Sequence, residues 1–231
     1  MSQGETQGPE EEMNMVYEQE IVNRHSVRKY TDRKIEGNVL ARLQEKIDSV
    51  NRESGMKMQL VLDEPRSFKG FMTKMTGFKN AVNYIACIGP KGDDLPMKAG
   101  YYGEDIVLYA QSLGLNTCWA MMCKKSLDAD DGYEQVINIA VGYGEEQGVP
   151  HKNRPVSDVA DLEGKPEWFV KGVEAAMLAP TGINAQKFRF DLVDGRVSLT
   201  GGKSALKQVD LGIVKFHFEC GAGKENFQWS E

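Results

Sequence analysis

The sequence predicts a protein of the α+β or α/β class, and two observations support this prediction. Helical and strand patterns alternate along the chain, and most of these patterns end at glycine or proline. The composition is that of a globular protein, with 41% hydrophobic and 27% charged residues among 231. A chain of this length forms one large domain or two closely packed halves.

Two helices and four strands are expected in the first half. Apolar residues recur at helical spacing over Val39–Val50, where Asn38 is placed to cap the helix. A second helix is expected over Met97–Leu113, because Gly114 follows it as a helix-ending residue. Alternating or continuous apolar residues predict strands at Met58–Leu62, Ala81–Ile88, Leu115–Met121 and Gln135–Tyr143.

The second half is shorter and has the same alternation. Pro166 opens a helix that Pro180 closes. A hairpin is expected over Phe188–Thr200, because Asp194-Gly195 is a typical two-residue turn. A final helix should begin after Ser204, its cap, and end near Gly221.

The order helix–strand–helix therefore occurs twice. Ile106–Tyr109 ends five residues before Gly114, and Ile213–Phe216 ends five residues before Gly221. A duplicated unit of this kind would place a cleft between its two halves.

Composition and charge exclude several classes of function. The net charge of −6 disfavours nucleic-acid binding, and the longest apolar runs are too short to cross a bilayer. Residues 1–14 are expected to form a disordered acidic tail without the pattern of a signal peptide. The four cysteines and three histidines lack metal-site spacing, which predicts reduced thiols, no metal and a cytoplasmic protein.

The most informative motif is Arg24-His25-Ser26-Val27-Arg28. On an extended segment, Arg24, Ser26 and Arg28 point the same way, so two guanidinium groups and a hydroxyl would face one point. Such donors make a good receptor for a phosphate or another anion. A solvated basic turn is an equally good interpretation of these residues alone.

Two other segments carry polar groups between predicted elements. His151-Lys152-Asn153-Arg154 is basic against an acidic background, and taken alone it is a surface loop. Ala179–Gln186 joins a helix to a strand, and its residues Asn184 and Gln186 could bind the polar edge of a flat heterocycle. The same residue types are also common in ordinary turns.

Together with the helix-to-strand segment, these motifs resemble, in this order, the FMN-dependent nitroreductase family. Arg24–Arg28 resembles its RxSxR signature, and Lys152–Pro155 resembles its phosphate-binding KxR. Gly114–Trp119 resembles the segment beside the isoalloxazine ring. Pro180–Gln186 resembles its PSxxNxQ loop, with Thr181 replacing the serine. This loop departs from ordinary members in position, because it follows the third helix here and the first helix there.

The resemblance implies a fold and an assembly. Family members have an α+β fold of three layers, in which helices flank a central, mostly antiparallel sheet, and are usually homodimers whose FMN contacts come from both subunits. This chain resembles the compact branch that fuses two degenerate, pseudo-symmetric halves. Residues 15–160 would then hold the flavin phosphate, and residues 161–231 would complete a single FMN cleft. A monomer or a weak homodimer is expected.

The resemblance also implies roles for residues. Arg28 would face the N1/O2 edge of the flavin, where a positive charge stabilises the reduced form. The backbone amides of Met121 and Met122 would lie near N5, at two positions where family members usually carry Glu-Gly or Gly-Gly. The phosphate would be held by Arg24, Ser26, Lys152 and Arg154. The full set of expected flavin-binding residues is Arg24, His25, Ser26, Arg28, Trp119, Met121, Met122, Lys152, Arg154, Pro180, Thr181, Asn184 and Gln186.

The implied function is hydride transfer from NAD(P)H through FMN to a small acceptor, such as a nitroaromatic compound or a quinone, with ping-pong kinetics. Because the flavin carries the chemistry, no catalytic acid or base is expected from the protein. Two alternatives remain at this point. One is a flavin- or ligand-binding protein without turnover, and the other is a general anion-binding α+β protein.

Overall fold

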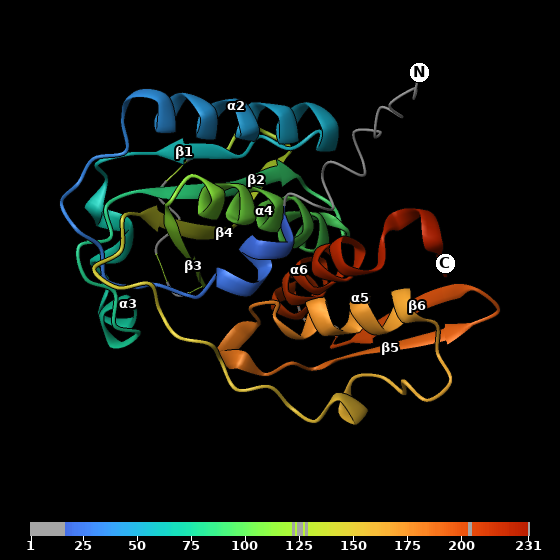
Figure 1. Ribbon diagram of the computed structural model, residues 1–231. Helices are drawn as coiled ribbons and strands as arrows, with labels where there is room; N and C mark the ends of the chain where they lie inside the picture. The colour runs from blue at the N-terminus through green and yellow to red at the C-terminus, as the bar shows by residue number, and fades with distance from the viewer. Residues whose placement is uncertain (1–16, 122, 124–126, 128, 203–204, 231) are drawn as a thin grey trace, which may run out of the picture.

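The computed structural model describes residues 17–121, 123, 127, 129–202 and 205–230. The expected tail over residues 1–14, Met122 and the expected cap Ser204 lie outside this part of the chain. Among the described residues, the strands form two sheets with helices packed around and between them (Figure 1). No helix of this part of the chain is both long and apolar enough to cross a membrane.

The larger sheet is antiparallel, with the strand order β1-β2-β4-β3. Its strand β2 is buried on both faces, because Ile85 and Cys87 belong to one hydrophobic core while Tyr84 and Ile88 belong to another. Burial on both faces explains the continuous apolar run in the sequence here. The bounds of the strands are β1 (Gln59–Val61), β2 (Tyr84–Pro90), β3 (Asn116–Ala120) and β4 (Tyr133–Gly142).

The smaller sheet contains the predicted hairpin. β5 (Phe188–Val193) and β6 (Arg196–Gly201) pair antiparallel around Asp194 and Gly195, whose φ angles of 49° and 76° suit a tight two-residue turn. A short strand, β7 (Gln228–Trp229), pairs parallel with β6 and was not expected from the sequence.

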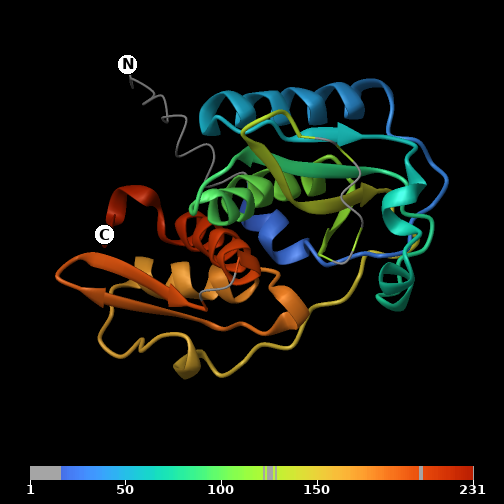
Figure 2. The ribbon, with the colours of Figure 1, turned by 180° about the vertical axis from the view of Figure 1, so that it is seen from behind.

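The long helix α4 lies between the larger sheet and α6, and α6 in turn packs against α5 (Figure 2). α2 covers the same side of the larger sheet as α4. Helix α2 begins at Gly37 with Glu36 in the cap position, so the prediction that Asn38 caps it is wrong. The helices are residues 17–23, α2 (Gly37–Ser54), α3 (Phe71–Met75), α4 (Leu95–Ser112), α5 (Glu167–Met177) and α6 (Ala205–Ala222), with 3-10 turns at η1 (Pro65–Phe68), η2 (Val156–Asp158), η3 (Gly182–Asn184) and η4 (Lys224–Asn226).

Two glycines allow α4 and α6 to cross with their backbones in contact. A Cβ atom added to Gly100 would lie 2.1 Å from the carbonyl oxygen of Val209, and one added to Gly212 would lie 2.0 Å from that of Met97. No side chain can occupy these positions, so the two helices approach more closely than side-chain packing would allow.

The segment that follows the first helix runs along the edge of β3. Ser26 pairs with Thr117 as an isolated parallel bridge, and the N–H of Val27 donates to the carbonyl oxygen of Thr117 at 3.0 Å. Further along, Tyr30 pairs with Gly144. This segment therefore covers the edge of the larger sheet and holds Ser26 beside β3.

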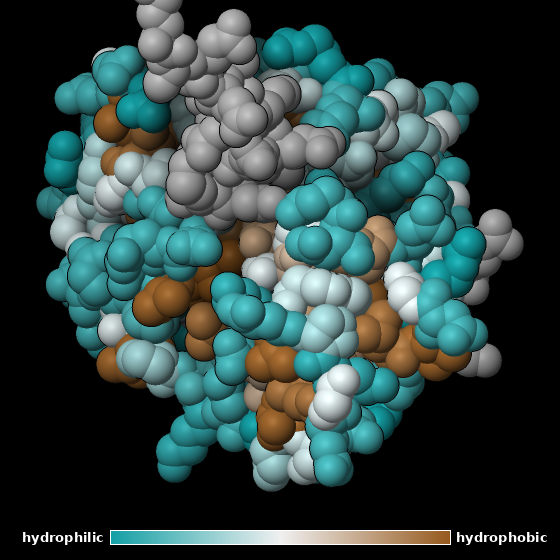
Figure 3. Space-filling view, turned by 45° about the vertical axis from the view of Figure 1, so that its right-hand side comes forward, coloured by the Kyte–Doolittle hydropathy of each residue, from teal (hydrophilic) through white to brown (hydrophobic). Residues whose placement is uncertain are grey.

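The predicted fold class is confirmed. The fold is α+β, with an antiparallel main sheet flanked by helices. On the face shown in Figure 3, apolar residues reach the surface in small groups that hydrophilic residues separate.

Candidate functional site

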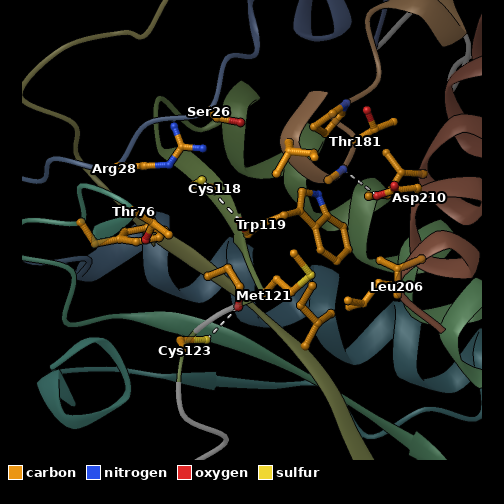
Figure 4. A pocket seen from close by; sticks show the side chains of 18 of the residues that line it. Ser26, Arg28, Thr76, Cys118, Trp119, Met121, Cys123, Thr181, Leu206 and Asp210 are labelled. Atoms are coloured by element: carbon orange, nitrogen blue, oxygen red, sulfur yellow. Dashed lines mark hydrogen bonds between the residues drawn. The ribbon is translucent and has the colours of Figure 1, made fainter. Parts of the chain in front are cut away.

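A cavity of about 390 Å³ lies where three distant parts of the chain meet (Figure 4). The segment containing Ser26 and Arg28 forms one side together with β3, and the loop Pro180–Ile183 with the start of α6 forms the other. Residues around α3 complete the wall. This volume is within the range of protein sites for small organic ligands.

Ser26 and Arg28 both line the cavity, as expected for alternate residues of an extended segment. The guanidinium of Arg28 lies near Ser26 in Figure 4. Among the described residues, Arg28 makes no ion pair within 4.0 Å. The cavity edge therefore carries a positive charge that is available to a ligand.

Arg24 does not line the cavity. Its side chain is buried, and its Nε lies 3.7 Å from Oε1 of Glu104 on α4. Burial lowers the pKa of Arg24 from its ordinary value, while the nearby Glu104 opposes this effect. The structure thus brings Arg24 to an internal carboxylate and leaves Ser26 and Arg28 at the cavity.

Glu104 is the centre of a buried polar cluster, which we define as Arg24, Glu104, Trp119 and His217. The indole Nε1 of Trp119 donates to Oε2 of Glu104 at 2.8 Å, and Nε2 of His217 lies 2.8 Å from Oε1. Both Glu104 and His217 are fully buried. Because Trp119 also lines the cavity, the cluster fixes the orientation of one cavity wall.

The position of the Trp119 ring also depends on a glycine of α4. A Cβ atom at Gly103 would lie 2.5 Å from the indole ring, so only glycine leaves room for the ring there. The indole is therefore positioned by Glu104 at its nitrogen and by α4 along its six-membered ring.

The loop opposite β3 is fixed by hydrogen bonds at both ends. The N–H of Gly182 donates to Oδ1 of Asp210 on α6 at 2.9 Å, and the N–H of Gln186 donates to Oγ1 of Thr181 at 3.0 Å. Burial raises the pKa of Asp210, although the Gly182 N–H and Lys207 favour its charged form. The hydroxyl of Thr181 thus closes this loop.

Gln186 connects this loop to the basic segment over residues 151–154. Its Oε1 accepts from the backbone N–H of Arg154 at 2.8 Å, and its Nε2 donates to Oδ1 of Asn153 at 3.0 Å. Nearby, Nδ2 of Asn184 donates to the carbonyl oxygen of Lys152 at 2.8 Å. The two polar segments, which the sequence separates by some thirty residues, are therefore direct neighbours.

His25, in the segment Arg24–Arg28, lies beside the loop that leads to the basic segment over residues 151–154. Burial first, and then the charges of Arg24 and His151, lower the pKa of His25. A Cβ atom at Gly148 would lie 2.7 Å from the Cβ of His25, so the loop before His151 packs closely on this residue. Side chains of Lys152 and Arg154 are exposed, and Arg154 lies 3.7 Å from Asp158.

The predicted site residues therefore fall into groups. Ser26, Arg28, Trp119, Met121, Pro180 and Thr181 line the cavity. His25, Lys152, Arg154, Asn184 and Gln186 belong to the adjoining loops, Arg24 is enclosed, and Met122 lies outside the described residues.

Sequence reasoning missed part of the lining. Leu206, Val209 and Ile213 have the spacing of a buried helix face, so their pattern gave no separate signal of a cavity. Lys207 and Asp210 lie on the same helix and also line the cavity. These two polar residues were the available sign that this helix face is not entirely packed in the core. The other missed lining residues are Thr73, Thr76, Phe78, Ala120, Cys123 and Ile137, whereas the lining residues Cys118, Gly182 and Ile183 lie within the expected segments Gly114–Trp119 and Pro180–Gln186.

The donor set of this region fits a flavin. The cavity wall is mainly apolar, with the hydroxyl of Ser26 and the guanidinium of Arg28 at one edge. Oδ1 of Asn184, in the adjoining loop, is buried and has no hydrogen-bond partner among the described residues. A flat apolar ring system with polar edges and an anionic group would suit the apolar wall and the donors of Ser26 and Arg28.

Comparison with known proteins shows the family to which the chain belongs. The protein family described as "Putative TM nitroreductase" matches residues 16–222. The chain belongs to this family. No curated protein matches the chain.

One solved structure of a protein described as a putative nitroreductase shows the same fold. The crystal structure of a "putative nitroreductase" from Thermotoga maritima MSB8 aligns with 96% of this chain and 88% of its own, at 22% identity and a TM-score of 0.64. A "putative nitroreductase in complex with FMN" from Exiguobacterium sibiricum aligns with 70% of this chain and 99% of its own, at 17% identity and a TM-score of 0.48.

Proposed function

We propose that this nitroreductase family member is an FMN-dependent oxidoreductase that passes hydride from NAD(P)H through FMN to a small organic acceptor, such as a nitroaromatic compound or a quinone. Family membership supports an oxidoreductase. The observation that carries the proposal is the cavity in which Ser26 and Arg28 lie on one side and the Thr181 loop on the other. Bound FMN would supply an acceptor for hydride at N5.

Within this proposal, each side chain has a physical task. Arg28 would place its charge at the N1/O2 edge of the ring and so favour the reduced, anionic form. Trp119 would form part of the ring-binding wall, held in orientation by Glu104. Ser26, Lys152 and Arg154 would bind the phosphate. Arg24 would act through the buried polar cluster, because its guanidinium lies at Glu104.

We also propose that the chain is a fused pseudo-dimer. The contacts between α4 and α6 are reciprocal, since Gly100 meets Val209 while Gly212 meets Met97. A twofold axis would relate Gly100 to Gly212 and Met97 to Val209, as in the interface of a symmetric dimer. This pairing of positions differs from the sequence comparison, which matched Ile106 with Ile213. Short apolar runs can be aligned in several ways, so they define such a match only loosely.

The test is steady-state kinetics of the FMN-loaded protein, with NAD(P)H varied at several acceptor concentrations. No separate nicotinamide motif is present in the sequence, so NAD(P)H and the acceptor should use the same cavity in turn. We expect parallel double-reciprocal lines. Intersecting lines would indicate a ternary complex and contradict the shared cavity.

The residue Met121 supports a second candidate function, that of a flavin-binding protein without turnover. Met121 lines the cavity and is 40% exposed, and Met121-Met122 stand where the resemblance places the Glu-Gly or Gly-Gly of family members. Its bulk could restrict access to the ring. If NAD(P)H fails to reduce the FMN-loaded protein, the chain is a flavin-binding protein without turnover.

A further inference from the structure

The mouth of the cavity is apolar. We define the apolar mouth as Met121, Ile183 and Leu206, which all line the cavity and are 40%, 94% and 44% exposed. They come from three separate elements: the end of β3, the η3 loop and the start of α6. Three large hydrophobic side chains exposed around one opening are more than scattered surface residues, and such groups mark binding surfaces.

Ile183 is held in a conformation that isoleucine rarely adopts. Its φ and ψ are 52° and 25°, in the left-handed region that disfavours β-branched residues. The hydrogen bonds of Gly182 to Asp210 and of Gln186 to Thr181 fix the loop on both sides. A strained residue with an almost fully exposed apolar side chain gains nothing from burial, so its position at the mouth points to a ligand.

We propose that Ile183, with Met121 and Leu206, is a specificity-determining clamp for an alkyl-substituted quinone. This inference rests on the proposed function, because it names the class of acceptor that the same cavity takes. The flat ring would enter the cavity and the alkyl chain would lie across the apolar mouth. Reduction to the hydroquinone consumes the hydride that NAD(P)H supplies and one proton from solvent.

The charges at the cavity support an uncharged acceptor. Arg28 is exposed at one edge of the cavity, where the proposed function assigns it to the flavin, while Lys207 at the mouth is paired with Asp210 at 3.7 Å. The paired charges leave the opening without a free carboxylate or ammonium among its described lining residues. An uncharged ring with an apolar chain therefore matches this opening better than a charged acceptor.

The experiment uses naphthoquinones whose alkyl chain grows from methyl to decyl. In the FMN-loaded wild-type protein, the KM should fall as the chain lengthens. Ile183→Asn should raise the ratio of the long-chain to the short-chain KM by about tenfold, because an apolar contact is lost. The same variant should raise the Tm, since asparagine tolerates the left-handed conformation.

Two control variants separate the apolar contact from other effects. Ile183→Leu keeps an apolar side chain and should keep the dependence on chain length. Val193→Asn replaces a 66% exposed valine that is not a lining residue of the cavity, and should leave the dependence unchanged. An unaltered chain-length dependence in Ile183→Asn would overturn the clamp.

A binding measurement distinguishes failure of the clamp from failure of the proposed reaction. Equilibrium dialysis of the same naphthoquinones without NAD(P)H requires no turnover. If affinity rises with chain length in the wild type and less so in Ile183→Asn, the clamp stands even when no acceptor is reduced. If affinity does not depend on chain length, the clamp is wrong whatever the kinetics show.

Discussion

Two arginines four positions apart have opposite environments, and the backbone explains the difference. The N–H of Arg24 donates to the carbonyl oxygen of Glu20 at 2.8 Å, so Arg24 still belongs to the end of the first helix. The alternation of side chains applies only to extended backbone, which begins after it. Sequence reasoning therefore placed Ser26 and Arg28 correctly on one side, but could not see that Arg24 leaves the pattern.

The charge at the cavity edge is testable through Arg28. The substitution Arg28→Gln should remove a charge-assisted hydrogen bond worth about 1.5–3 kcal/mol. The affinity for FMN should therefore fall by about one to two decades. The midpoint potential of bound flavin should also fall, because the reduced anion loses its cation. Fluorescence titration with FMN measures the first effect and redox titration the second.

A matched variant controls for a general loss of positive charge. Arg196 lies on β6, is exposed, and is not a lining residue of the cavity. Arg196→Gln should leave both the FMN affinity and the potential unchanged. Equal behaviour of the two variants would remove Arg28 from the proposed site.

At the scale of elements, the sequence predicted best where glycine or proline interrupts the chain. The strand Phe188–Val193 has the predicted bounds, because a two-residue turn fixes its end. Helix α4 begins two residues before the predicted start and ends one residue before the predicted end at Leu113. The strand expected over Ala81–Ile88 begins later, at Tyr84. Just before it, the side-chain Oδ1 of Asn83 accepts a hydrogen bond from the backbone N–H of Asp63, which follows β1.

The elements that the sequence missed are short. β7 has two residues and joins β6 through long-range parallel pairing, which leaves no local pattern. α3, with five residues, gave no helical periodicity, yet it brings Thr73 to the cavity. Local patterns predict long elements, whereas such short ones depend on tertiary contacts.

The crossing of α4 and α6 predicts an unusual effect of alanine. Intrinsic helix propensity alone would make Gly212→Ala stabilising by about 1 kcal/mol. The added methyl group would meet backbone atoms of Met97 and Tyr101 at 2.0 and 2.7 Å, which cannot move independently. We expect a net destabilisation of about 2–3 kcal/mol in urea unfolding.

Gly182→Ala is the appropriate comparison. Its added Cβ would lie 3.5 Å or more from the nearest atoms, which is ordinary contact. The free energy of unfolding should change much less than in Gly212→Ala. A stabilised Gly212→Ala variant would show that the two helices do not cross in backbone contact.

The link between the η3 loop and α6 predicts a dependence on pH. Because burial raises the pKa of Asp210, the folded state holds this proton more tightly than the unfolded state. The contribution to stability is complete below the ordinary value of 3.8 and is lost as the pH rises through the higher pKa of the folded state. The free energy of unfolding of the wild type, minus that of Asp210→Asn, should therefore fall over this range.

Asp191 provides the control, since it is exposed on β5 and lies outside the loop. Unfolding measured in urea at several pH values should give a smaller change for Asp191→Asn. A difference for Asp210→Asn that rises with pH would mean that hydrogen bonding from Gly182 outweighs burial.

At the scale of the whole molecule, the proposed fusion predicts one FMN per chain. FMN should bind more tightly than riboflavin, because the exposed side chains of Lys152 and Arg154 would bind its phosphate in the proposed site. Removing that phosphate should cost about one to two decades in affinity. Absorbance of the released flavin per polypeptide measures the stoichiometry, and two FMN per chain would contradict a single cleft.

The site as a whole was predictable only in part, because three distant segments form it. Motifs identified Ser26, Arg28 and the Thr181 loop, since their residue types are unusual for their positions. The contribution of α6 could not be seen, because a helix face that lines a cavity has the same apolar spacing as one that packs in a core. Only the tertiary structure distinguishes the two.

The crossing at Gly100 and Gly212 also has a consequence for the order of folding. During synthesis, the segment of Ser26 and the strand β3 leave the ribosome long before α6, which supplies the opposite wall of the cavity. Contacts between such distant residues must wait for the intervening chain, and they slow folding. A nascent chain that lacks α6 should thus be unable to bind flavin, so capture of the cofactor would report that translation has passed the second glycine.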